Sequence, residues 1–85
     1  MLIRVSKLAE KQLRKVKTDR ELYQRLNNAL DDIAANPNIG KLLEGDLKGV
    51  RAWRVGDWRI IYQVYRSQLL ILVIRIAHRR QVYRK

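Results

Sequence analysis

Halfway along this chain, the spacing of the apolar residues changes from helical to alternating. In the first half, five apolar residues fall at positions i, i+4, i+7, i+8 and i+11, which is the spacing of one helix face. They are Leu22, Leu26, Ala29, Leu30 and Ile33. After residue 52, apolar and polar residues alternate, as they do in a β-strand with one buried face. A chain with this switch must cover a sheet face with helices.

The first half predicts one strand followed by two helices. Leu2–Val5 fits a short strand, and Ser6 after it is a suitable N-cap for a helix that ends near Lys17. The next four residues, TDRE, match a capping box, which predicts a second helix with Thr18 as its N-cap. This helix must end before Pro37, because proline cannot continue the hydrogen-bond ladder and disfavours helical backbone at the preceding residue.

The second half predicts three strands joined by short turns. The strands are Trp53–Val55, Trp58–Tyr65 and Leu69–Ala77, followed by a short tail from Arg80. Gly56-Asp57 fits a tight hairpin turn of type II′, and such short connections make an antiparallel meander. The sequence therefore predicts a single α+β domain, residues 1–85, with two layers in the order β-α-α-β-β-β. Two helices pack on one face of an antiparallel sheet.

The positive charge is concentrated in the part of the chain that forms the predicted strands. The net charge is +11 over 85 residues, and 47% of the residues are hydrophobic, which is ample for a folded domain. Residues 46–85 hold ten Lys and Arg against Asp46 and Asp57, so their partner must be an external polyanion. Nucleic acid fits better than a membrane surface, because membrane binding usually uses a basic amphipathic helix.

Several functional classes are excluded by residue types that the chain lacks. There is no cysteine, hence no disulfide framework and no thiolate zinc site, and His78 is the only histidine. We therefore expect neither a metal nor another cofactor. The longest apolar run, Leu69–Ile74, is too short to span a bilayer, and the first residues lack the apolar core of a signal peptide. We expect a soluble cytoplasmic protein.

Alternation predicts that arginines of the strands share one face. Arg59 lies on the polar side of the second predicted strand. In the last strand, Arg75 and Arg79 alternate away from the apolar Ile74, and Tyr83 continues their face if the backbone stays extended. These residues would line an open surface opposite the helices. A shift of one residue in the strand register would place these side chains on the opposite face of the sheet.

With its predicted elements in this order and its motifs at this spacing, the chain resembles the RelE/ParE superfamily of bacterial and archaeal toxins, in its RelE-like branch. The resemblance covers nearly the whole length. It rests on the β-α-α-β-β-β order and on the stretches NPNIGKLLEGDLKG, RVGDWRIIYQV and AHRRQVY. It implies the toxin of a type II toxin–antitoxin system that cleaves mRNA in the ribosomal decoding site without a metal ion. In that chemistry the ribose 2′-OH attacks the adjacent phosphate and leaves a 2′,3′-cyclic phosphate.

The resemblance also implies the partners. They are mRNA on the ribosome, ribosomal RNA and a cognate RelB-like antitoxin. An antitoxin must cover both a basic site and exposed apolar surface, so we expect it to contribute an acidic, amphipathic helical segment.

Four residues match positions to which the resemblance assigns chemistry, and His78 is a fifth candidate because of its own side-chain chemistry. Arg59 and Arg79 are interpreted as electrostatic stabilisers, because a guanidinium binds phosphate with two hydrogen bonds but cannot exchange protons near neutral pH. Tyr83 matches a C-terminal tyrosine that can stack on a base and take part in proton transfer. Arg54 matches a basic position before the hairpin turn. His78 is a candidate acid or base, although a lone histidine at a strand end is more often structural.

Further residues are candidates for binding RNA by charge or by stacking. Family members often carry a second basic group where Ala52 stands here, and Arg51 lies one step out of register with that position. Only a β-bulge would bring Arg51 to the site. The full set is Arg51, Trp58, Arg75, Arg80, Arg84, Lys7, Lys11 and Lys15. For each the alternative is an ordinary role, either as a solvated charge or, for Trp58, in core packing.

Two rival functions stay open. A ParE-like inhibitor of DNA gyrase shares the fold, but the ending HRRQVY is more typical of the RelE-like branch. A non-catalytic RNA-binding protein or an inactivated toxin is also compatible with the sequence, because of Ala52 and because no general base is evident.

Overall fold

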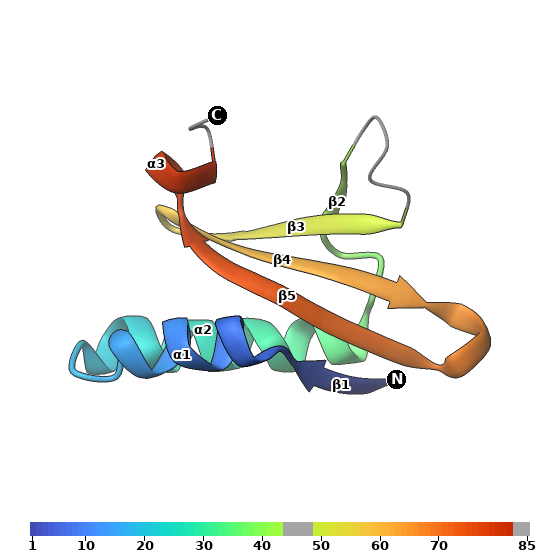
Figure 1. The fold of residues 1–85 in the computed structure, drawn as a ribbon, viewed down its shortest axis with the longest axis horizontal. Coiled ribbons are helices and arrows are strands. Elements are labelled where there is room, and N and C mark those ends of the chain that lie inside the picture. The colour runs from blue at the N-terminus through green and yellow to red at the C-terminus, as the bar shows by residue number, and fades with distance from the viewer. Residues whose placement is uncertain (44–48, 83–85) are drawn as a thin grey trace.

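Two helices lie along one face of a five-stranded sheet in the computed structural model of this chain, which describes residues 1–43 and 49–82 (Figure 1). α1 packs against β5, and α2 packs against β3. The predicted α+β class with two helices on one sheet face is confirmed. The strands are β1 (Leu2–Val5), β2 (Lys41–Leu42), β3 (Val50–Val55), β4 (Trp58–Tyr65) and β5 (Leu70–His78). The helices are α1 (Lys7–Lys15), α2 (Arg20–Ala35), α3 (Arg79–Val82) and the 3₁₀ turn η1 (Arg66–Gln68).

The sheet has the strand order β1-β5-β4-β3-β2. β3, β4 and β5 form the predicted antiparallel meander, in which β4 has the predicted bounds and β3 begins three residues earlier, at Val50. β1 runs parallel to β5, so the sheet is mixed rather than wholly antiparallel as predicted. The parallel pair is possible because the chain between β1 and β5 passes through both helices and the strands β2 to β4, far more than the dozen or so residues that a parallel connection needs. The strand β2 was not predicted, since two residues are too few to show a period.

Both long helices begin at a capping side chain. Ser6 caps α1 as predicted, since its hydroxyl accepts a hydrogen bond from the Ala9 N–H at 3.1 Å. The prediction of Thr18 as the cap of α2 was wrong. Asp19 takes that position, in extended backbone, and its carboxylate accepts the Leu22 N–H at 3.2 Å. Aspartate caps at least as well as threonine, so the helix starts one residue later.

The predicted stripe of α2 packs onto the sheet, where the core lies. Leu26, Ala29, Leu30 and Ile33 are buried against strand residues that include Ile60 and Tyr62. A fully buried aliphatic side chain stabilises a fold by about 1.5–3 kcal/mol relative to an exposed one, so burial of these side chains contributes substantially to stability.

A bulge in β5 departs from the predicted alternation. Tyr62 pairs with Val73 and Ile61 pairs with Arg75, so Ile74 is an extra residue. Ile76 faces the helices as predicted, but the bulge puts Val73 rather than Ile74 on that side. Helix α1 satisfies the irregular backbone. The Ser6 hydroxyl donates to the Ile74 carbonyl at 2.7 Å, and the Gln12 Oε1 atom accepts the Ile76 N–H at 2.7 Å.

At one end of the sheet, β3 and β4 are joined by a tight turn, whereas β5 runs into a short helix. Val55 pairs with Trp58, which leaves Gly56 and Asp57 as the predicted two-residue turn, and the φ of Gly56 is +60°. β5 stops at His78, and the chain enters α3, which stands on the side of the sheet away from α1 and α2 (Figure 1). From Arg79 to Val82 the backbone is therefore helical and not extended, so the condition for extending the strand's alternation beyond Arg79 is not met.

Candidate nucleic-acid interface

The face of the sheet opposite α1 and α2 carries three of the strand arginines. Arg54 on β3 lies directly opposite Arg59 on β4, and Arg75 on β5 lies opposite Ile61, one pair further along. We call the surface formed by Arg54, Arg59 and Arg75 the arginine face. Directly opposed like charges repel each other across a sheet, and a bound anion would reduce this repulsion.

A hollow of about 260 Å³ opens on the arginine face. It is lined by Lys41, Leu43, Ala52, Arg54 and Arg59, which come from or directly follow three neighbouring strands. None of these described lining residues is acidic. Sequence reasoning missed Lys41, because its place here depends on the pairing of β2 with β3. No signal along the chain shows that pairing.

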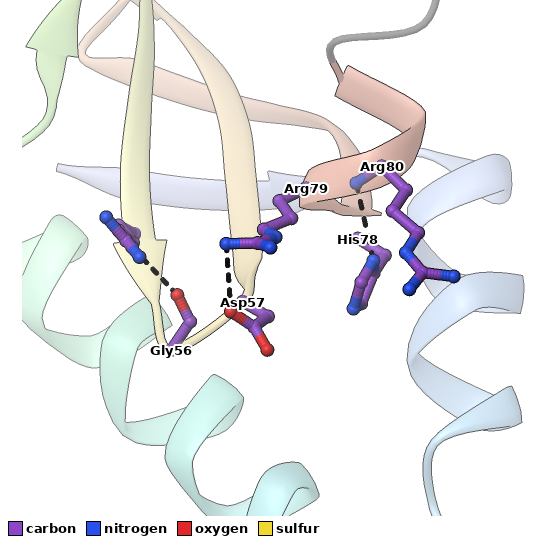
Figure 2. A network of polar contacts seen from close by, with 6 residues as sticks. Gly56, Asp57, His78, Arg79 and Arg80 are labelled. Carbon is purple, nitrogen blue, oxygen red and sulfur yellow. Dashed lines mark hydrogen bonds and ion pairs between the residues drawn. The ribbon is translucent and has the colours of Figure 1, made fainter.

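The hairpin turn contacts two of the predicted arginines, and Figure 2 shows one of them, Arg79, beside Asp57. The Arg54 Nε donates to the Gly56 carbonyl at 2.8 Å. The Arg79 N–H donates to the Asp57 carbonyl at 2.7 Å, and its side chain reaches across the turn to an Asp57 oxygen at 4.0 Å. This ion pair is long and exposed, and such pairs contribute little to stability. The structure thus places Arg54, Arg59 and Arg79 around the same end of β4.

His78 lies apart from this group. Its ring packs edge-on against the Trp58 indole, with centroids 5.4 Å apart, and its Nδ1 accepts the Arg80 N–H at 3.3 Å. Both rings line a separate cavity of about 420 Å³ beside the start of α2, on the helix side of the sheet. The structure therefore does not bring His78 and Trp58 to the arginine face.

Arg51 also points to the helix side. β3 pairs with β4 without interruption from Val50 to Val55, so the bulge that would bring Arg51 to the arginine face does not occur. Its guanidinium instead donates to the Gly40 carbonyl at 2.8 Å and to the Asn38 carbonyl at 3.3 Å. These bonds tie the segment before β2 to the sheet.

The Tyr62 hydroxyl completes this attachment from inside the core. It donates to the Pro37 carbonyl at 2.8 Å and accepts the Gly40 N–H at 2.9 Å. Burial raises the pKa of Tyr62 above its usual 10.0, although the Gly40 N–H and the Arg51 charge act in the opposite direction. A Cβ on Gly40 would lie 2.6 Å from the Tyr62 oxygen, so only glycine fits there.

The other predicted RNA-binding residues are dispersed. Lys7, Lys11 and Lys15 are exposed on α1, in the layer behind the sheet. Arg80 leaves α3 in the direction away from Arg79 (Figure 2). Tyr83 and Arg84 lie outside the described residues.

In the described part of the chain, no cluster of three or more His, Asp or Glu could hold a metal ion. The helices there are all too short or too polar to span a membrane.

Comparison with known proteins finds toxins. Residues 3–83 match the family described as the ParE toxin of the type II toxin–antitoxin system parDE. Toxin RelG of Mycobacterium tuberculosis is 29% identical over 58 residues, which cover 67% of each chain.

Solved structures show the same fold. The RelBE2 toxin–antitoxin complex of M. tuberculosis contains a chain with 26% identity and a TM-score of 0.76, covering 91% of this chain and 95% of that one. Isolated Escherichia coli RelE matches with a TM-score of 0.76 at 20% identity, covering 91% and 82%. The YoeB/ParE toxin from Agrobacterium tumefaciens matches with a TM-score of 0.78 at 20% identity, covering 92% and 98%. The match over nearly the whole length and the shared fold lead to one assignment: the chain belongs to the ParE toxin family of type II toxin–antitoxin systems, within the RelE/ParE superfamily.

Proposed function

We propose that this toxin is a ribosome-dependent mRNA endoribonuclease that works without a metal ion, as its resemblance to the RelE-like branch implies. The observation that supports the proposal best is the hollow on the arginine face, where Lys41, Arg54 and Arg59 meet. A phosphodiester fits this hollow, because its oxygens can accept hydrogen bonds from two guanidinium groups.

The proposed reaction needs charge stabilisation more than covalent participation of the protein. The 2′-oxygen loses its proton and bonds to the adjacent phosphorus, and the bond from phosphorus to the 5′-oxygen breaks. The 5′-oxygen keeps the electron pair and takes up a proton, so the products are a 2′,3′-cyclic phosphate and a 5′-hydroxyl. Arg54 and Arg59 stabilise the negative charge that develops on the non-bridging oxygens. Arg79, at the edge of the same face, binds a neighbouring phosphate.

Proton transfer falls to a different type of side chain. Arginine cannot accept the 2′ proton near neutral pH. His78 lies on the helix side with its ring against Trp58, so we assign proton transfer to Tyr83 on the strength of the resemblance alone. The ribosome contributes by holding the mRNA near its attack geometry, which is worth several orders of magnitude in rate. Accordingly, free mRNA should be cut far more slowly than ribosome-bound mRNA.

We also propose a cognate antitoxin that covers the arginine face with an acidic, amphipathic helical segment. Related toxins from M. tuberculosis, E. coli and Staphylococcus aureus were solved as complexes with antitoxins, which supports such a partner. Exposed apolar side chains, Leu8 at 51% and Leu42 at 50% exposure, offer apolar contacts outside the basic site.

Inhibition of DNA gyrase is the second candidate function. The family that matches residues 3–83 is described as the ParE toxin, which favours gyrase inhibition. Gyrase inhibition is binding of a protein, so it does not require the paired arginines Arg54 and Arg59.

A primer-extension map of one translated mRNA, made after induction of the toxin, tests the proposal. Wild type should give cuts confined to translated codons, and Arg59→Ala should lose them. Arg20→Ala is the matched control, because it removes one exposed positive charge from the start of α2, in the other layer. Intact mRNA with growth still arrested would favour gyrase inhibition instead. Intact mRNA with normal growth would leave a non-catalytic binding protein.

A further inference from the structure

We infer that Lys41 is a phosphate-binding residue of the hollow on the arginine face and supplies the positive charge that Ala52 lacks. The inference rests on the proposed function, because it assigns a further group to the same site. It also makes a separate claim about anion binding, which does not depend on cleavage.

The register of the sheet places Lys41 in the site. Lys41 on β2 is directly opposite Ala52 on β3, and directly opposed residues share a face with Cβ atoms about 4.5–5.5 Å apart. Ala52 is opposite Ile61, two residues from the pair that Arg54 and Arg59 form. Lys41 and Ala52 therefore stand beside the two arginines and line the same hollow.

The side chains at this point are complementary in size. The Ala52 methyl group leaves room that a long side chain at position 52 would fill, and the hollow of about 260 Å³ occupies that room. Lysine brings an ammonium on a flexible stem with three donors, whereas Arg54 and Arg59 present planar forks. Together they can surround the non-bridging oxygens of one phosphate from three neighbouring strands.

The backbone before Lys41 is held firmly, which separates this lysine from an ordinary surface lysine. Gly40 is bonded on both sides, because its N–H donates to the Tyr62 hydroxyl at 2.9 Å and its carbonyl accepts from Arg51 at 2.8 Å. Tyr62 is fully buried and also bonds to Pro37. Arg51 thus acts on the site from the helix side, as a positioning residue for the strand that carries Lys41.

Lys41 needs no proton transfer for this role. Its ammonium binds a non-bridging phosphate oxygen in the ground state and more strongly as negative charge develops there, so both RNA binding and the cleavage rate should depend on it.

Two measurements on the same variants test the inference. The first is single-turnover cleavage of mRNA on programmed ribosomes. The second is the affinity of a short single-stranded RNA with 2′-O-methyl groups, which cannot be cleaved, measured by fluorescence anisotropy over a range of salt concentrations. We expect Lys41→Ala to slow cleavage at least tenfold and to reduce the slope of log affinity against log salt by about 0.7, the loss of one phosphate contact. Lys17→Ala, which removes an exposed lysine of the other layer, should change neither quantity.

A charge swap gives the sharper test. The double variant Lys41→Ala/Ala52→Lys returns an ammonium to the same hollow from the opposite strand, so it should recover most of the lost rate and the lost salt slope. Thermal melting of Ala52→Lys alone verifies that lysine is tolerated at this position. Unchanged rate and slope in Lys41→Ala would overturn the inference, as would a folded double variant without recovery. If wild type cleaves nothing, the nuclease proposal fails, and the salt slopes still decide whether Lys41 contacts phosphate.

Discussion

The same strands build both faces of the sheet, yet the two faces have opposite physical character. On the side covered by α1 and α2, Ile60, Tyr62 and Ile76 have no exposed surface. On the open side, Arg54 on β3 lies opposite Arg59 on the neighbouring strand β4, and like charges so placed repel each other. Burial stabilises the first face, whereas the second brings two cationic side chains opposite each other. Substitutions on the helix side should therefore change stability, and substitutions on the arginine face should change binding and cleavage.

The largest effect on stability is expected from truncating a buried strand residue. Ile60→Ala removes a fully buried side chain and leaves a cavity, so it should lower the free energy of unfolding by about 2–5 kcal/mol. Ile61→Ala, its neighbour on the open face, is only half-buried and should cost clearly less. Urea denaturation of both variants measures the difference. Equal losses would contradict the division between the two faces.

The Tyr62 hydroxyl should come next. Tyr62→Phe leaves the Gly40 N–H and the Pro37 carbonyl without their partner, at a cost of about 1–3 kcal/mol. Because Tyr62 positions the segment before Lys41, salt-dependent RNA affinity should fall as well. Urea denaturation and anisotropy measure the two effects. A variant with wild-type stability would show that this attachment is dispensable.

The pH dependence of stability follows from the same hydroxyl. Burial raises the pKa of Tyr62 above 10.0, so the folded state keeps the proton where the unfolded state loses it. The stabilisation is complete below pH 10 and is lost as pH rises through the folded-state pKa. Wild type should therefore lose stability above pH 10 more steeply than Tyr62→Phe does. Parallel slopes for the two proteins would disprove the linkage.

A smaller loss is expected from the bulge in β5. Gln12→Leu leaves the Ile76 N–H without its acceptor and should cost about 1–2 kcal/mol. Since the bulge sets the face on which Arg75 lies, RNA affinity should fall too, although position 12 belongs to the helix layer. Gln24→Leu is the matched control, because Gln24 is exposed and bonds only to Asn28 among the described contacts. Identical RNA affinity in the two variants would separate the bulge from binding.

The smallest effect on stability belongs to the arginine face itself. Arg54→Ala removes one of two opposed charges together with an exposed hydrogen bond to Gly56, so stability should change by less than about 1 kcal/mol in either direction. RNA affinity should fall at the same time. Thermal melting and anisotropy give the two numbers. A large loss of stability would mean that Arg54 serves the fold rather than the site.

The two faces also differ in how far the sequence predicts them. The stripe from Leu22 to Ile33 and the alternation of β4 identify the helix side correctly, because burial imposes a period on the chain. The bulge at Ile74 has no such signature, since its backbone is satisfied by Ser6 and Gln12, more than 60 residues away. The cap of α2 shifted from Thr18 to Asp19 because two adjacent residues both suit that position.

The candidate site is predictable only in part for the same reason. The pairing of Arg54 with Arg59 follows from the two-residue turn at Gly56-Asp57, which is local. Lys41 reaches the hollow through the pairing of β2 with β3, which no pattern along the chain indicates. Arg51 looks suitable by type and position, yet an uninterrupted strand turns it toward Gly40. Local turns can be deduced from the sequence, whereas the pairing register between distant segments becomes known only from the structure.

The central claim, that the arginine face cleaves a phosphodiester by attack of the 2′-OH, is tested most directly on mRNA bound to purified ribosomes. The mRNA carries a single 2′-deoxy nucleotide at the mapped cleavage position, and the unmodified mRNA is the reference. We predict that the wild-type toxin cuts the reference to a 5′ fragment ending in a 2′,3′-cyclic phosphate, leaves the deoxy mRNA intact, and loses at least 100-fold in rate on the reference when Arg59 is replaced by Ala. Equal cutting of both mRNAs, or full activity of Arg59→Ala, would contradict the account.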